Sequence, residues 1–415
     1  MRRTRYMTKN DVKTALLAAI VYSANYIARY NFSAALVEMV NTFGADSKAL
    51  LGLALTLSSI SYGGGQIISG IFGDRIPPRY MVALGLFGSG LCNVAVGLSD
   101  NVTFITVLWF CNGLCQALIW PSLVRQMTCD MTAEGYQHGI VWASAGCSFA
   151  TVLVYLAIVP VSILISSWRL AFYFAGGFAA LIAILWFFSV RTIGRDNDVP
   201  AEPTPTEESA PARKRSALAI LFFAGVPVIY LVIACQGLLR DGVTNWMPTL
   251  ISETYDLGSV ASIMSSAVLP LFSTISVFAV GALYLKIRNE LTTTAILWGI
   301  GTLSTFFILF FLDSSPVLTV ILLAILMSCV HGINHVLTAR MPRHFASVGL
   351  VSTASGLLSS ATYVGSAASG YGIAVFSDAY GWNGTIVMWG IVGTLGLLVT
   401  IAVFRRWKRF IAEHP

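Results

Sequence analysis

The sequence predicts an all-α membrane protein, with twelve transmembrane helices in two pseudo-symmetric halves of six. Three observations support this: the composition, the recurrence of long apolar runs and an internal repeat. Of the 415 residues, 56% are hydrophobic and only 11% are charged, and the mean hydropathy is +0.76. A soluble domain carries roughly 25% charged residues because its surface meets water. The composition therefore excludes an ordinary soluble domain, and most of the surface must face lipid.

The apolar runs are long enough to cross a bilayer, which takes about twenty helical residues. The six predicted spans of the first half are 13–40, 49–73, 80–98, 102–126, 137–164 and 170–190. Those of the second half are 218–249, 257–285, 291–312, 315–338, 349–376 and 383–404. Residues 191–217 contain no apolar run and are rich in Pro, Ala, Glu and Arg, so they are expected to be a disordered cytoplasmic linker. The domains expected are 1–190, the linker 191–217 and 218–415.

The positive charges predict the orientation of the chain. Of the 25 Lys and Arg residues, 21 precede or open the first span, close or follow an even-numbered span, or close the chain. Since cytoplasmic loops carry the excess of Lys and Arg, both termini are expected to be cytoplasmic in a multi-pass protein of the cytoplasmic (inner) membrane. The net charge of +6 is then explained by the excess of Lys and Arg on the cytoplasmic side. Therefore no nucleic-acid partner is expected.

An internal repeat relates the two halves. A shift of about 211 residues places Arg29 on Arg240 and Arg75 on Lys286, each in the equivalent helix of its half. Two parallel six-helix repeats are the architecture of major facilitator transporters, which bind substrate near the bilayer midplane between the halves.

The segment after the second span supports the same assignment. Its sequence, GIFGDRIPPR, resembles the cytoplasmic loop motif G-x-x-x-D-R-x-G-R of the major facilitator superfamily. We expect Asp74, Arg75 and Arg79 to form a conformational latch there, pairing with groups at neighbouring helix ends. This latch would set the conformational balance of the protein and would not recognise substrate.

Two arginines, Arg29 and Arg240, lie deep within predicted spans. A Lys or Arg at the bilayer centre costs at least about 2.5 kcal/mol, so such residues need a functional reason. The repeat places Arg29 and Arg240 at equivalent depths, and we expect them to face each other across the central axis. Each planar guanidinium can bind a phosphate or carboxylate through two hydrogen bonds. In the alternative, each arginine merely pairs with a nearby acid, such as Asp241 beside Arg240.

Around these arginines the chain resembles the organophosphate:phosphate antiporter family. The pattern Y-x-x-x-Y-x-x-R-x-N-F is met by YSANYIARYNF in span one. Further matching segments are ISYGGGQIISG, NGLCQALIWPSLVR, LLRDGVTNWMPT and TASGLLSSATYVGSAASG. The resemblance implies that Arg29 and Arg240 hold the anionic group of the substrate. The residues expected to complete the substrate site are Tyr22, Tyr26, Tyr62, Gln66, Trp120, His331 and Tyr363.

Three departures from that family bear on the substrate. Its phosphate carriers have a Lys where this chain has Tyr30, a Lys at Gln66 and a His at Ser148. Losing these groups lowers the positive field of the cavity. The departures favour a carboxylate, a phosphonate or a monoanion over a doubly charged phosphate ester, and the sequence does not decide among them.

The leading hypothesis is a secondary transporter of a small organic anion, working by alternating access with exchange as its default mode. A proton-coupled symporter of organic acids is the alternative: Asp241 favours it as the coupling group, whereas Ala28 and Gln116 replace the acids expected of such carriers. A third hypothesis is a receptor that senses a phosphorylated ligand. We expect a monomer in the lipid bilayer with a small anionic substrate. No enzyme activity or cofactor is expected. No metal is expected either, because His331 and His335 have no accompanying ligand.

Overall fold

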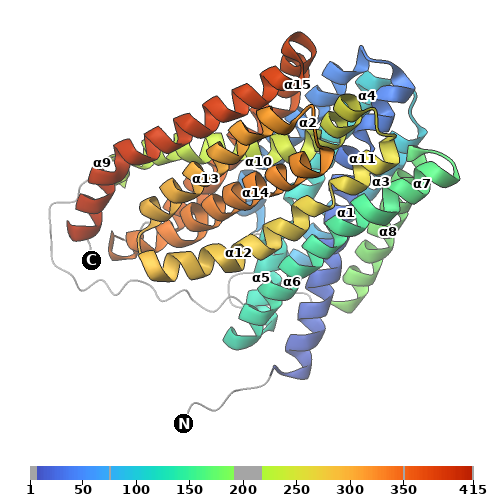
Figure 1. Ribbon diagram of the computed structural model, residues 1–415. Helices are drawn as coiled ribbons and strands as arrows, with labels where there is room; N and C mark the ends of the chain where they lie inside the picture. Colours follow the sequence, from blue (N-terminus) through green and yellow to red (C-terminus); the bar gives the residue numbers. More distant parts are fainter. Residues whose placement is uncertain (1–6, 74–75, 191–216, 349–350, 414–415) are drawn as a thin grey trace. The chain divides into compact units, whose positions relative to one another are not determined.

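The computed structural model describes residues 7–73, 76–190, 217–348 and 351–413. All regular elements in these ranges are helices (Figure 1). The predicted latch residues Asp74 and Arg75 lie outside the described residues, as does the predicted linker except for Ala217, which opens a helix.

By internal contacts the chain divides into two units, which are described separately. Unit 1 consists of residues 1–201 and 257–270. Its helices are α1 (Lys9–Phe43), α2 (Ser47–Gly73), α3 (Pro78–Leu98), α4 (Val102–Ala117), α5 (Ile119–Asp130), α6 (Ala133–Leu153), η1 (Val154–Ile158), α7 (Val159–Ile165), α8 (Trp168–Ser189) and α11 (Ser259–Ser265). Helix α1 packs against α6 and α8, α2 against α4, and α3 against α4 and α8. The α11 segment comes from the second half of the sequence, and it contacts α1, η1 and α7.

Unit 2 consists of residues 202–256 and 271–415. Its helices are α9 (Ala217–Phe223), α10 (Val226–Tyr255), most of α12 (Val268–Ile287), α13 (Glu290–Phe311), α14 (Pro316–Asn334), η2 (His335–Arg340), η3 (Met341–Val348) and α15 (Val351–Glu413). Helix α10 packs along α15 and against α14, and α13 packs against α14 and α15. Helix α15 covers both of the last predicted spans, which are separated by the non-helical Gly381 at φ 68°.

The helices have the dimensions and surfaces of membrane spans. Nine of those within the described ranges are long and apolar enough to cross a membrane. Helices α1 and α2, of 35 and 27 residues, cover the first two predicted spans. Large apolar side chains are exposed along the helices, including Leu164 (73%), Phe188 (77%) and Phe310 (76%). In water such surfaces would be unfavourable, but in a bilayer they face lipid.

Prolines explain where the predicted spans are interrupted. Pro121 lacks the N–H that would bond to the Ala117 carbonyl, and the helix breaks there into α4 and α5. The π-helical turn η1 directly precedes the segment containing Pro160, and the π-helical turn η2 precedes Pro342. A wider turn accommodates a proline ring without ending the span.

Candidate functional site

Arg29 lies on α1 beside an aromatic ring from α2. Its guanidinium carbon is 4.4 Å from the centroid of the Tyr62 ring, and Tyr62 is only 4% exposed. At this distance a cation is attracted by the negative face of the ring. Gln66 lies one turn further along α2 and is half-buried. The structure therefore brings two of the predicted site residues, Arg29 and Tyr62, into contact.

Three further predicted residues form an aromatic cluster on the same face of α1. Tyr22 and Tyr26 are one helical turn apart, with ring centroids 4.9 Å apart and hydroxyl oxygens 3.5 Å apart. Trp120 on α5 packs on Tyr22 with a centroid separation of 4.5 Å. Arg29 follows Tyr26 by three residues, so the two tyrosines and the arginine share one side of the helix. This face offers a cation and hydroxyl donors together.

A buried amide network holds the turn of α1 that carries Arg29, and the sequence did not predict it. The carbonyl of Ala28 accepts hydrogen bonds from the side-chain amides of Asn93 on α3 (3.0 Å) and of Asn112 (3.3 Å) and Gln116 (3.2 Å) on α4. Ser89 donates to Asn112 at 2.6 Å, and all these side chains are at most 2% exposed.

A carbonyl oxygen has two lone pairs, so the three amides share this acceptor, and together they connect the turn of α1 that carries Arg29 to α3 and α4. A second contact comes from Asn31, which donates to Asn93 at 2.8 Å. The sequence does contain a signal for this network, namely polar side chains in otherwise apolar spans. Polar groups buried in a bilayer must find partners.

In unit 2, Arg240 on α10 pairs with the residue that follows it. Its Nε donates to Asp241 Oδ1 at 2.6 Å, with the two side chains 16% and 11% exposed. The other carboxylate oxygen of Asp241 accepts a hydrogen bond from Ser366 on α15. Of the two expectations for Arg240, the pairing with the adjacent acid is therefore observed. The pairing uses Nε, one of the donor groups of the guanidinium.

The helix crossing that carries this pair is unusually close. A Cβ atom on Gly365 of α15 would lie 1.9 Å from the Ala234 carbonyl oxygen of α10, and one on Gly237 would lie 2.1 Å from the Thr362 carbonyl oxygen. Only glycine permits this approach, so Gly365 and Gly237 are close-packing points between α15 and α10. The half-buried Tyr363 lies on α15 beside this crossing, and the half-buried His331 lies on α14, which contacts α10.

Of the predicted latch residues, Arg79 lies within the described part of the chain. Its guanidinium carbon is 4.3 Å from the centroid of Phe187 on α8. Nearby, Arg125 at the end of the fourth predicted span donates to the carbonyl of Ile76 at 3.4 Å. The Arg125 contact ties the loop before α3 to α5, and the Arg79 contact joins α3 to α8. The latch itself stays a prediction, because its other two residues are not described.

The beginning of α1 is tied to α6 by a carboxylate ahead of the first apolar run. Asp11 caps its own helix through Thr8 and accepts from the backbone N–H (2.9 Å) and hydroxyl (3.0 Å) of Thr132. Burial by itself would raise the pKa of Asp11, but the hydrogen bonds from both threonines outweigh it and hold the pKa below the usual value.

Residues 18–370 match the family model of the Major Facilitator Superfamily. The chain therefore belongs to this superfamily, and it is a multi-pass membrane protein. Solved structures agree: a bacterial homologue of the human lysosomal transporter Spinster superposes with a TM-score of 0.71 over 98% of this chain and 96% of that one, at 16% identity. A peptide transporter, POT, superposes with a TM-score of 0.72 over 96% and 95% of the chains, at 13% identity. The predicted twelve-helix fold class is confirmed.

Sequence relatives narrow the family. The chain is 27% identical to the glycerol-3-phosphate transporter of Bacillus subtilis and 26% identical to the membrane sensor protein UhpC of Escherichia coli. It is 23% identical to a probable hexose phosphate transport protein of Chlamydia trachomatis. These matches cover 56%, 63% and 94% of this chain and 56%, 61% and 90% of the relatives. The predicted placement in the organophosphate:phosphate antiporter family is confirmed. Since this chain spans less than two thirds of the first two relatives, their activities do not transfer directly.

Proposed function

We propose that this protein is a secondary transporter of a small organic anion, with a phosphate, phosphonate or carboxylate group, that works by alternating access and exchange. The observation that carries the proposal is the pair of repeat-equivalent arginines, each set among hydrogen-bonding groups in a membrane span. The named relatives, a glycerol-3-phosphate transporter and a probable hexose phosphate transport protein, support a phosphorylated substrate.

In this proposal Arg29 and Arg240 bind the anionic group of one substrate. Tyr22 and Tyr26 donate hydrogen bonds from the same face as Arg29, and Tyr62 orients the guanidinium by stacking on it. The remaining predicted site residues, which complete the binding surface, are Gln66, Trp120, His331 and Tyr363. A guanidinium in low dielectric is costly unless an anion compensates its charge, so the carrier would change between its two open states mainly with substrate bound, which favours exchange.

Asp241 adds a competition step in unit 2. An entering anion must share Arg240 with this carboxylate, which is already held by Ser366. Protonation of Asp241 would release Arg240 for the substrate, which is the basis of the second candidate function, proton-coupled symport of an organic acid.

A third candidate, a receptor for a phosphorylated ligand, is supported by the likeness to the membrane sensor protein UhpC. Such a protein binds the same class of ligand but does not need to carry it across the bilayer. The amide network that fixes the Arg29 turn serves binding equally well in a receptor and in a transporter. Only a measurement of ligand transport across the membrane therefore distinguishes the two.

The orientation is also proposed: both termini lie on the cytoplasmic side of the inner membrane, and the protein acts as a monomer. The positive-inside distribution of Lys and Arg supports the orientation. Access of a membrane-impermeant reagent to single cysteines placed at Lys9 and Lys408 in intact cells would test it.

Uptake into proteoliposomes separates the three candidates. Vesicles are loaded with inorganic phosphate or left unloaded, and labelled glycerol phosphate, inorganic phosphate, a phosphonate and a carboxylate are supplied outside. Uptake that requires the internal anion supports exchange. Uptake into unloaded vesicles that requires an inward proton gradient identifies a symporter. Ligand-induced thermal stabilisation without any uptake identifies a receptor. If none of the four anions stabilises the protein or is taken up, the proposed substrate class is rejected.

A further inference from the structure

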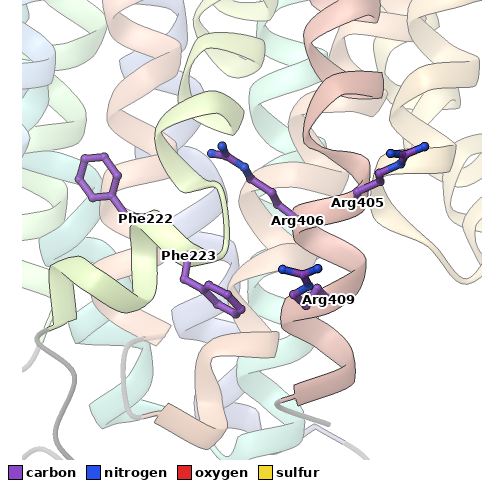
Figure 2. Close-up of a pocket in the computed structure, with 5 residues that line it drawn as sticks. All are labelled: Phe222, Phe223, Arg405, Arg406 and Arg409. Carbon is purple, nitrogen blue, oxygen red and sulfur yellow. The ribbon is translucent and has the colours of Figure 1, made fainter.

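A cavity with basic and aromatic lining lies in unit 2, where the last predicted span ends. A cavity of about 290 Å³ is lined by Phe222 and Phe223 of α9 and by Arg405, Arg406 and Arg409 of α15. Figure 2 shows Phe223 directed from α9 toward Arg409, and Arg406 reaching from α15 toward the end of α9. Among the described residues, the lining contains three positive charges and no carboxylate. This combination fits a phosphate and disfavours a cation.

The backbone on both sides of the cavity is held in place. Beside it, Gly225 adopts φ 80°, and a Cβ atom there would lie 2.6 Å from Val403 and 3.7 Å from the Arg406 Cβ. The chain between α9 and α10 therefore lies directly against α15 at the level of the arginines. A larger residue would push α9 away and open the cavity.

The inner face of the same α15 turn is packed with aromatic rings. Trp407 and Phe410 are at most 1% exposed, and their rings stack with centroids 5.5 Å apart. Phe410 also contacts Phe345, with a centroid separation of 4.9 Å. Since the inward residues are fixed, the outward arginines project from a rigid turn, so little backbone ordering is needed when a ligand binds.

The helix face that carries the arginines is apolar further into the span. Leu398 and Ile401 are 59% and 57% exposed, and Arg405 and Arg409 continue the same face at helical spacing. Phe222, at 65% exposed, adds apolar surface beside the charges. A ligand that fits this whole surface has a negative headgroup attached to a hydrocarbon chain.

We propose that this basic and aromatic cavity binds an anionic phospholipid, with the phosphate on Arg406 and Arg409 and an acyl chain along Leu398 and Ile401. In Figure 2 Arg405 leaves α15 on the side opposite to Arg406, so it flanks the headgroup position next to the apolar face of Leu398 and Ile401. Basic pockets at the ends of membrane helices are suited to such headgroups. The proposal goes beyond transport and does not depend on the identity of the substrate.

The test uses the purified full-length protein in neutral detergent, with added dioleoyl phosphatidylglycerol or dioleoyl phosphatidylcholine. The two lipids share acyl chains and differ in headgroup charge. Native mass spectrometry counts the lipid retained, and thermal unfolding measures stabilisation. Wild type should retain phosphatidylglycerol at least about threefold better than phosphatidylcholine, and its unfolding temperature should rise only with the anionic lipid.

The triple variant Arg405→Gln, Arg406→Gln, Arg409→Gln should lose this preference. Lys408→Gln is the matched control, because Lys408 is exposed on the same turn but does not line the cavity. Should the triple variant fail to fold, Arg406→Gln and Arg409→Gln singly should each retain less than half as much phosphatidylglycerol as wild type.

Two results would overturn the proposal. One is an equal loss of phosphatidylglycerol in Lys408→Gln, because binding would then depend on net charge and not on the cavity. The other is stabilisation by inorganic phosphate that matches that by the lipid and is absent in the triple variant, because the site would then serve a soluble anion. Neither result would bear on uptake by the proposed exchanger.

Discussion

Arg29 and Arg240 occupy equivalent positions in the repeat but have different neighbours. Arg29 lies over the face of Tyr62, whereas Arg240 donates to the carboxylate of Asp241. An aromatic ring interacts with the face of a guanidinium, whereas a carboxylate accepts hydrogen bonds from its N–H groups. The two units thus stabilise a half-buried cation by two different means. In the proposed function, an anion that binds in unit 2 competes with an internal carboxylate.

The largest effect is expected from replacing the arginines themselves. Arg29→Lys and Arg240→Lys should each reduce exchange in proteoliposomes by at least about 100-fold, because an ammonium cannot bind two oxygens of one anion in a planar geometry. Thermal unfolding should stay close to wild type. Wild-type exchange in either folded variant would contradict the proposal that the two arginines act together.

A smaller effect is expected from the amide network, which is specific to unit 1. Asn112→Leu removes one donor to the Ala28 carbonyl and leaves Ser89 without its acceptor, so unfolding should become easier by about 1–3 kcal/mol. It should also weaken anion binding, since the turn that carries Arg29 loses support.

Thr305→Val is the control for this network. Thr305 is fully buried in unit 2 and bonds only within its own helix to the Gly301 carbonyl. It should lower stability without changing anion affinity. Equal effects of the two variants on affinity would show that the network serves only general stability.

Asp241→Asn tests the carboxylate that distinguishes unit 2. Asparagine keeps the shape of the side chain and can still bond to Ser366, but it carries no charge. If the carboxylate competes with the substrate, the apparent affinity should improve by up to about tenfold, or about 1.4 kcal/mol, with exchange retained. Affinity and exchange are measured together in loaded proteoliposomes. Loss of uptake driven by a proton gradient would instead support symport.

The smallest effect is expected from replacing Asp11, which ties the beginning of α1 to α6 in unit 1. The folded state holds the pKa of Asp11 below its usual value of 3.8, so its contribution to stability is present above that value and is lost as the pH falls through the lowered pKa. Wild type should therefore be more stable than Asp11→Asn at pH ~6, and the difference should shrink below pH ~4. A difference that does not depend on pH would show that the Asp11 charge is unimportant.

Much of the fold could be predicted because a bilayer imposes simple rules on a chain. Length and hydropathy located the spans, but several of them are subdivided, including those that contain Pro121 and Pro160, and the spans 218–249 and 257–285. The repeat showed that Arg29 and Arg240 are equivalent. Sequence spacing also showed that Tyr22, Tyr26 and Arg29 share a helix face.

Other features depend on contacts between distant segments, which spacing along one helix does not reveal. The convergence of Asn93, Asn112 and Gln116 on one carbonyl requires the mutual positions of three helices. The pairing of Arg240 with Asp241 depends on side-chain rotamers, because adjacent residues leave a helix about 100° apart. The contact of α11 with α1 and α7 could not be predicted from the internal repeat either, because the repeat assigns these segments to different halves.

The amide network also has a consequence for the biogenesis of the protein. The side-chain amides of Asn93, Asn112 and Gln116 enter the bilayer on two later spans, whereas their common acceptor, Ala28, is on the first. Until these spans associate, the amides lie in hydrocarbon without the partners that the folded state supplies, which is unfavourable. We therefore expect α1, α3 and α4 to associate during or soon after insertion, so the turn that carries Arg29 is formed before the second half of the chain has left the ribosome.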